Sequence, residues 1–165
     1  MMSDPAEPAP SAAARANSFP WPPVLLAAAL AGAWLMGHVA PLGWPGLDDM
    51  AARVIGATFG IGGAALIAWS VSTLIRHKTT VMPDQTSTVL VTSGPYSFFR
   101  NPIYLGETLV MLGIADFTKN IWFALAAIAF AVLVTLLQIG PEERHLEHRF
   151  GAAYRDYKLR TRRWI

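Results

Sequence analysis

The sequence predicts an all-α membrane protein: a polytopic helix bundle of about four transmembrane helices, followed by a C-terminal amphipathic helix at the interface. Two observations carry this prediction. Of the 165 residues, 53% are hydrophobic and only 15% are charged, whereas soluble domains carry about 25% charged residues. The apolar residues also lie in long blocks and are not spaced with the period of an amphipathic helix or strand. A chain of this length accommodates one domain.

The first block, Val24 to Ala40, is expected to be a retained first helix. The residues before Pro41 do not offer the small-x-small pair that a signal peptidase prefers. Residues 1–19 are rich in Ala and Pro and have too few large apolar side chains to fold, so we expect a disordered tail. Residues 20–165 then form a single membrane domain, whose motif-bearing part is 76–165.

The second block runs from about Arg53 to Ile75 and is long enough to cross a hydrocarbon layer of about 30 Å. Within it Gly56, Gly60 and Ala64 recur at every fourth position, which predicts a smooth face for a neighbouring helix. The stretch GIGGAA at 60–65 lacks a preceding strand, so helix packing explains it better than nucleotide binding does.

The segment 76–101 is polar and cannot face lipid with unpaired backbone groups, so it is expected at the interface or inside protein. The apolar stretches 103–117 and 121–139 follow and are expected to form a helical hairpin. Its first arm is short for a crossing and carries Glu107. The charged part after Gly140-Pro141 shows an apolar stripe with spacings of 4, 4 and 3, which predicts one amphipathic helix at the interface. This stripe consists of Leu146, Phe150, Tyr154 and Tyr157.

Positive charge is distributed unevenly over the predicted loops. With four crossings, every Lys and Arg except Arg53 and Lys119 falls on one side. Lys and Arg in short loops prefer the cytoplasmic side. We therefore expect both termini and the polar segment 76–101 to face the cytoplasm, most simply at a bacterial inner membrane.

Composition also limits the chemistry. Cysteine is absent, which excludes disulfides, thiolate metal sites and cysteine nucleophiles. His145 and His148 are three residues apart beside acidic residues, but no third ligand of known position converges on them. A solvated helix face is the favoured interpretation, and no metal site is predicted.

Two segments carry the residues suited to chemistry, and the topology places both on one side. GPYSFFRNPIYLGE at 94–107 lies where a loop enters the membrane, and the second segment begins at Pro141 with Glu142 and Glu143. Together they supply a guanidinium, carboxylates and aromatic faces. A sulfonium cofactor has groups complementary to all of these. Its methyl transfer is an in-line displacement that needs alignment and exclusion of water, without a metal or cysteine.

The run GPYSFFRNPIY at 94–104 resembles the signature of the isoprenylcysteine carboxyl methyltransferase and phospholipid methyltransferase group. The segments KTTVMP, VLVTSGPY and EERHLEHRFGAAYRDYKLRTRRW are also similar to the bacterial branch of that group, so the resemblance covers roughly residues 54–165. It implies a binding site for S-adenosyl-L-methionine, built by the last hairpin and the C-terminal helix. It further implies a lipophilic substrate that enters from the bilayer.

The resemblance also assigns roles to individual residues. The implied cofactor-binding residues are Tyr96, Arg100, Asn101, Pro102, Tyr104, Glu142 and Glu143. The candidate catalytic residues are Arg100, Tyr104 and Glu107. Glu107 is included because an ionisable side chain inside a membrane helix is costly to bury and is therefore a functional candidate. Prenylcysteine enzymes carry His where Asn101 stands here, and Asn cannot take up a proton at neutral pH. The acceptor therefore remains open between a carboxylate, an amine and a thiol.

Each of these residues also has a structural interpretation. Arg100 could anchor a helix end, the two tyrosines could belong to an interfacial belt, and Glu107 could pair with Arg100. Glu142 and Glu143 follow Pro141, so they could occupy the first turn of a helix, where its dipole favours acidic residues.

Two alternatives to methyl transfer remain. PIYLGE at 102–107 also resembles an element of membrane sterol-type reductases that use NADPH, and a scaffold without chemistry is possible. The expected partners are the lipid bilayer and a lipophilic small-molecule or lipid substrate. No nucleic acid is expected, and the oligomeric state stays open.

Overall fold

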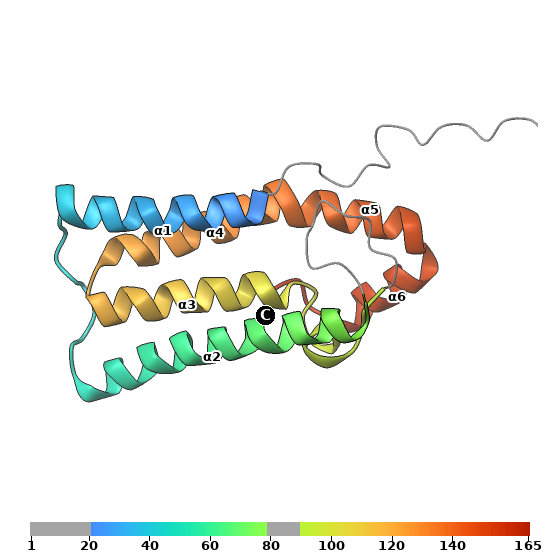
Figure 1. Cartoon of the computed structure of the whole chain (residues 1–165), viewed down its shortest axis with the longest axis horizontal. Helices are drawn as coiled ribbons and strands as arrows, with labels where there is room; N and C mark the ends of the chain where they lie inside the picture. The colour runs from blue at the N-terminus through green and yellow to red at the C-terminus, as the bar shows by residue number, and fades with distance from the viewer. Residues whose placement is uncertain (1–20, 79–89) are drawn as a thin grey trace, which may run out of the picture.

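The computed structural model describes residues 21–78 and 90–165, and in these ranges the fold is a helix bundle (Figure 1). The all-α prediction is confirmed, because this part of the chain contains no strand beyond one isolated bridge. The expected tail at 1–19 lies outside the described residues. The long helices are α1 (Trp21–Val39), α2 (Met50–Arg76), α3 (Pro102–Thr118) and α4 (Ile121–Val134). The shorter elements are η2 (Gly94–Ser97), η3 (Thr135–Ile139), α5 (Gly140–Phe150) and α6 (Ala152–Arg160).

The long helices lie side by side in the order α1, α4, α3, α2 (Figure 1). Three helical segments are long and apolar enough to cross a membrane, namely Pro22–Val39, Met50–Arg76 and Ile121–Phe150. Helix α3 has 17 residues and lies between α2 and α4. The protein is therefore an integral membrane protein by the length and composition of its helices, and a fourth crossing by α3 remains a prediction.

Glycine permits the close approach of α2 and α3. A Cβ atom on Gly63 would lie 2.6 Å from the carbonyl oxygen of Gly106, and one on Gly113 would lie 2.6 Å from the Cα of Gly60. The predicted smooth face is thus confirmed for Gly56 and Gly60. It continues through Gly63 and not through Ala64, which is exposed. A helical turn has 3.6 residues, so a strict four-residue repeat drifts off the contact face.

The predicted hairpin of α3 and α4 is confirmed. Helix α3 ends at Lys119, which has a left-handed φ of +51°. The side chain of Asn120 then caps α4 by accepting a hydrogen bond from the backbone N–H of Trp122 (3.0 Å). The core of the bundle lies along this hairpin and includes Met111, Phe130 and Val134.

The expected helix break at Gly140-Pro141 is wrong. Helix α4 passes through the π-helical turn η3 into α5, so residues Ile121–Phe150 form one long helix. The backbone N–H of Gly140 donates to the carbonyl of Thr135, five residues earlier. Such a wide turn accommodates the proline ring and its missing N–H, which would disrupt a regular α-helix. Glu142 and Glu143 therefore lie inside a continuous helix, and a free helix N-terminus does not explain them.

The single amphipathic helix expected after Pro141 is also wrong. Gly151, with φ +53° and ψ −122°, ends α5 and starts α6, so the chain turns back toward the bundle (Figure 1). Glycine adopts this conformation without the penalty that a side chain would bring. Tyr154 and Tyr157 are buried, whereas Phe150 is only partly buried. The two tyrosines of the predicted stripe thus pack against protein.

Candidate active site at the α5 end of the bundle

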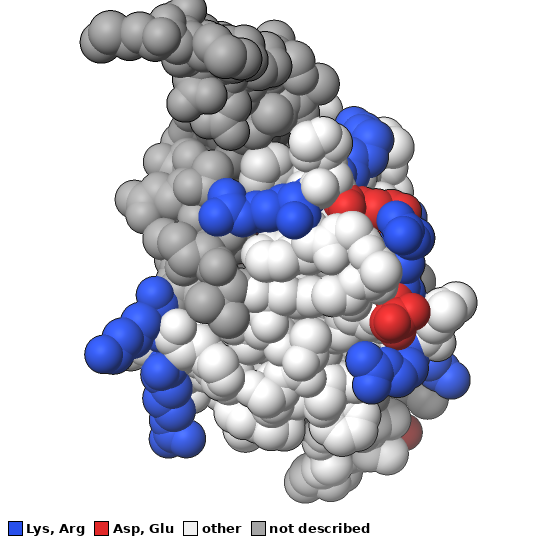
Figure 2. Space-filling view, turned by 90° about the vertical axis from the view of Figure 1, so that its right-hand side faces the viewer, with Lys and Arg blue, Asp and Glu red and all other residues white. Residues whose placement is uncertain are grey.

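The residues singled out in the sequence converge at one end of the bundle, where η2, the start of α3, α5 and α6 meet (Figure 1). Figure 2 views this end directly and shows Lys and Arg side chains around its rim. Among the described residues, every Lys and Arg except Arg53 and Lys119 belongs to the elements at this end. The side of the membrane on which it lies remains a prediction.

Residues 98–101 and 161–164 are held together by backbone pairing, and we call this pair of segments the C-terminal clasp. The backbone N–H of Arg100 donates to the carbonyl of Arg162 (2.7 Å), and the N–H of Arg162 donates to the carbonyl of Phe98 (3.0 Å). The side chain of Asn101 donates through Nδ2 to the carbonyl of Arg163 (3.1 Å). Asn101 therefore contacts the C-terminal segment.

The side chain of Arg100 makes hydrogen bonds to three groups of the protein. Its Nε donates to Oε1 of Glu143 (3.1 Å), and its Nη1 donates to the carbonyls of Thr161 (2.6 Å) and Lys158 (3.2 Å). The side chains of Arg100 and Glu143 are only 11% and 9% exposed. This arrangement differs from simple anchoring at a lipid boundary, because the guanidinium binds protein groups on three sides.

Glu143 is shared between two arginines. Arg163 donates to it through Nε (3.1 Å) and Nη2 (2.5 Å), besides the bond from Arg100. The carboxylate of Glu143 raises the pKa of Arg163 above its ordinary value. The three side chains satisfy one another, so Glu143 holds α5 against the clasp.

The short helix η2 is fixed between α2 and α6. The hydroxyl of Tyr157 donates to the carbonyl of Tyr96 (2.7 Å), and burial raises the pKa of Tyr157 to about 12. Gly94 has φ +60°, and a Cβ there would lie 2.9 Å from Oγ1 of Thr73 on α2. A glycine is therefore required for this close approach. Pro102 is buried at the start of α3.

Tyr96, Tyr104, Glu107 and Glu142 form what we call the polar cluster. The Tyr104 hydroxyl lies within electrostatic range of both carboxylates and of Tyr96. Burial and the charge of Glu142 raise the pKa of Tyr96, so this phenol remains a hydrogen-bond donor at neutral pH. These four predicted residues are brought together from η2, α3 and α5.

Glu107 is not paired with Arg100, whose contacts are described above. Its Oε2 atom is buried and has no hydrogen-bond partner among the described residues. Burying a carboxylate oxygen without a partner is costly, and such atoms in native proteins call for an explanation. A ligand that donates hydrogen bonds would supply one.

Two further residues of this site were not predicted from the sequence. Gln138 is 1% exposed with its Oε1 unpartnered, and both ring nitrogens of His145 are buried without partners among the described residues. The solvated face expected for His145 is therefore wrong, while His148 is exposed. The spacing of 138, 142 and 145, four and then three residues, was a signal that these side chains share one helix face.

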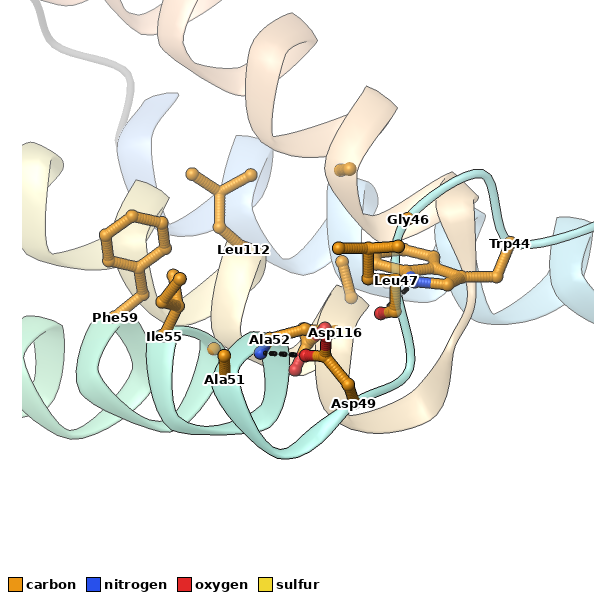
Figure 3. A pocket seen from close by; sticks show the side chains of 13 residues that line it. Trp44, Gly46, Leu47, Asp49, Ala51, Ala52, Ile55, Phe59, Leu112 and Asp116 are labelled. Carbon is orange, nitrogen blue, oxygen red and sulfur yellow. Dashed lines mark hydrogen bonds between the residues drawn. The ribbon is translucent and has the colours of Figure 1, made fainter.

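Apolar hollows lined by described residues lie at two places along the bundle. One, of about 400 Å³, is at the opposite end, between the start of α2 and the end of α3, and includes Trp44 and Phe59 (Figure 3). The other, of about 440 Å³, runs between α3 and α4 and is bordered by Thr108 and Trp164. We call the second the α3–α4 groove. The hydroxyl of Thr108 donates to the carbonyl of Tyr104 (2.8 Å), so this groove begins within one helical turn of the polar cluster along α3. Within residues 21–78 and 90–165, no three His, Asp or Glu side chains are grouped as metal ligands.

Three relatives match parts of the chain. An uncharacterized protein of Haemophilus influenzae is 36% identical over 63 residues, which are 38% of this chain and all of the relative. The nickel-cobalt-cadmium resistance protein of Alcaligenes xylosoxydans xylosoxydans is 37% identical over 46% of this chain. The cobalt-zinc-cadmium resistance protein of Cupriavidus metallidurans is 38% identical over 44% of it. The matches cover only 35% and 33% of these two resistance proteins.

No solved structure matches this chain significantly. The profile of the phospholipid methyltransferase family, however, matches residues 51–153. That range extends from the start of α2 to the start of α6, so it includes the four residues of the polar cluster and the helices that carry them. The protein belongs to the phospholipid methyltransferase family of membrane methyltransferases.

Proposed function

We propose that this protein transfers a methyl group from S-adenosyl-L-methionine to a lipophilic acceptor at the α5 end of the bundle. The observation that carries the proposal is the polar cluster, in which Oε2 of Glu107 is buried without a partner among the described residues, at the end of an otherwise apolar bundle. Family membership supplies the reaction class. Clusters of this kind mark functional sites, because structure alone does not favour them.

The hydrogen-bond donors of this cofactor are complementary to the acceptor oxygens at the candidate site. Its ammonium, ribose hydroxyl and adenine amino groups all donate hydrogen bonds. Glu107 presents a buried carboxylate oxygen without a partner among the described residues, and Glu142 adds a second carboxylate from α5. Carboxylates also favour a cationic ligand through charge. The residues of the polar cluster therefore fit a cationic nucleoside better than they fit an anionic ligand.

The residues of the candidate site would have different roles in the reaction. When bound, the cofactor supplies the sulfonium methyl group. Tyr104 and Glu107 are the proposed catalytic residues, because they combine a phenol donor with an unpartnered carboxylate near the start of α3. Glu107 can accept a proton from the acceptor or hold it in line for attack, and alignment and exclusion of water supply most of the rate enhancement in such displacements.

Arg100, Asn101 and Glu143 are positioning residues in this proposal. Their hydrogen bonds join the start of α3 and the start of α5 to the C-terminal segment. The clasp therefore fixes the distance between Glu107 on α3 and Glu142 on α5. Rigid support of this kind is what a displacement with strict alignment requires.

The lipophilic part of the acceptor would lie in the α3–α4 groove. The groove is lined almost entirely by apolar side chains, among them Ile128 and Val132 on α4 and Leu136 on η3, which are exposed. Its end at Trp164 reaches the clasp, because Trp164 belongs to both. An acceptor with an alkyl chain in the groove would place its polar end toward Glu107. We place this end at the cytoplasmic face of a bacterial inner membrane, as the distribution of Lys and Arg predicts.

Binding measurements test the cofactor. Purified protein in detergent is titrated with S-adenosylhomocysteine by calorimetry, and NADPH is titrated in parallel. We expect heat of binding with the first compound only. Binding of NADPH alone would favour a reductase, and binding of neither by folded protein would favour a scaffold.

Product analysis tests the acceptor. Membrane lipid extract is incubated with the protein and methyl-labelled cofactor, and the products are resolved by mass spectrometry. We expect label in a lipid fraction with wild-type protein and a strong reduction with Glu107→Gln. Asp116→Asn is a matched control on the same helix at the opposite end of the bundle, and it should retain activity.

A further inference from the structure

Three polar residues share one face of the long helix where it leaves the apolar part of the bundle. Gln138 lies in η3, and Glu142 and His145 lie in α5. We call these three residues the polar stripe. The side chain of Gln138 lies within hydrogen-bonding reach of Glu142. Residues three and four apart are neighbours on a helix surface, so the stripe forms one continuous wall.

The π-helical turn accounts for this alignment. A wide turn inserts one extra residue, which rotates the following helix by about 100° relative to the preceding one. Val134 and Ile139 on either side are fully buried, so the turn keeps the apolar contacts while it moves the start of α5. Turns of this kind are rare within α-helices and are frequent at functional sites. The irregular backbone of this turn therefore points the polar stripe toward the protein interior, where side-chain atoms of Gln138 and His145 are buried.

The stripe has unused hydrogen-bonding capacity. Gln138 Oε1 and both ring nitrogens of His145 have no partners among the described residues. A neutral imidazole has one donor and one acceptor, and an amide oxygen is an acceptor. A ligand that satisfies these atoms and Oε2 of Glu107 must carry several hydrogen-bond donors and at least one acceptor.

We infer that Gln138 and His145 bind the cofactor, with Gln138 accepting a hydrogen bond from an amino or hydroxyl group of the nucleoside sulfonium. This inference rests on the proposed function and extends its binding site by two residues, Gln138 in η3 and His145 in α5. His145 lies one turn beyond Glu142, so it contacts a part of the ligand farther from the methyl group. Glu142 lies between the two and neutralises positive charge.

The experiment uses substitutions that remove polar atoms and keep side-chain volume. Affinity for S-adenosylhomocysteine is measured by calorimetry for Gln138→Leu and His145→Leu, and the unfolding temperature is measured without ligand. Each variant should bind roughly 5- to 10-fold more weakly, as expected for the loss of one or two hydrogen bonds. His145→Leu should not unfold at a lower temperature, because both ring nitrogens that it removes lack partners among the described residues. Gln138→Leu also removes the hydrogen bond to Glu142, so its unfolding temperature should fall slightly.

His148→Leu is the matched control, since His148 is exposed on the same helix, and it should bind as the wild type does. His145→Asn keeps a donor and an acceptor and should recover part of the affinity. Unchanged affinity in Gln138→Leu and His145→Leu would overturn the inference while wild-type binding upheld the proposed function. A fall in unfolding temperature that matches the loss of affinity would assign the stripe to packing. Absence of binding by the wild type would overturn both proposals.

Discussion

The two ends of the bundle hold ion pairs of similar length in very different surroundings. At the α5 end, Arg100 and Glu143 are 3.1 Å apart and about nine-tenths buried. At the opposite end, Arg53 and Asp48 are also 3.1 Å apart, but their side chains are 64% and 53% exposed. Water screens the second pair and has largely been removed from the first. Distance alone therefore does not measure what an ion pair contributes.

The two ends also differ in their polar groups. The hollow near Trp44 contains Asp49 and Asp116, and both have partners: Asp49 caps α2 through Ala52 (2.9 Å), and Asp116 binds Lys119 (2.9 Å) (Figure 3). The unpartnered buried polar atoms of the described residues belong to Glu107, Gln138 and His145, around the α5 end. Satisfied polar groups need no ligand, so this difference supports the proposed binding site at the α5 end.

The largest expected effect is on stability at the α5 end. Glu143→Ala should lower the free energy of unfolding by about 3 kcal/mol or more, because it leaves Arg100 buried without its carboxylate. Denaturant titration in detergent, followed by Trp fluorescence, measures this change. Asp48→Ala at the opposite end is the control, and an equal loss in both variants would show that burial does not distinguish the two pairs.

The next largest effect is expected on the rate of methyl transfer. Glu107→Gln should reduce methyl transfer about 10- to 100-fold, the cost of losing a hydrogen bond to a charged group, while the free energy of unfolding is unchanged or higher. The rate is measured at saturating cofactor, beside the Asp116→Asn control on the same helix. A stable Glu107→Gln variant with the wild-type rate would remove Glu107 from the catalytic residues.

A smaller effect is expected at the C-terminal clasp. Nε1 of Trp164 donates to Oγ1 of Thr135 (3.2 Å), so Trp164→Phe should cost about 1 kcal/mol of stability. Thr135→Val removes the other partner. Combining the two substitutions should cost less than the sum of their separate effects, since they share one hydrogen bond. Strict additivity would mean that this bond contributes nothing.

The smallest effect on stability is expected at the end of the bundle opposite α5. Asp48→Ala removes ion pairs with Arg53 (3.1 Å) and Lys119 (3.3 Å) and should cost about 0.5 kcal/mol or less. The difference from the wild type should shrink further in high salt, because screening acts on exposed charges. A cost that persisted in salt would indicate that these side chains are less accessible to water than in this structure.

The sequence by itself determined the helical membrane fold, the hairpin of α3 and α4, and the end of the bundle at which the site lies. These follow from the length of the apolar blocks, from turn residues such as Lys119 and Asn120, and from the separation of charge along the chain. All are local or additive properties, so they can be read without knowing how the helices pack. The family resemblance at 94–104 likewise depended on a contiguous motif.

Only the tertiary structure separated Glu142 from Glu143. The two are adjacent in sequence and chemically alike, yet Glu143 faces the two arginines of the clasp and Glu142 faces the tyrosines of the polar cluster. Which way each points depends on the rotation of α5, and the π-helical turn sets that rotation. The π-helical turn itself depends on how Pro141 is accommodated, because packing against the other helices keeps Ile121–Phe150 one continuous helix. No local pattern encodes this outcome, because it is decided by contacts between residues far apart in the chain.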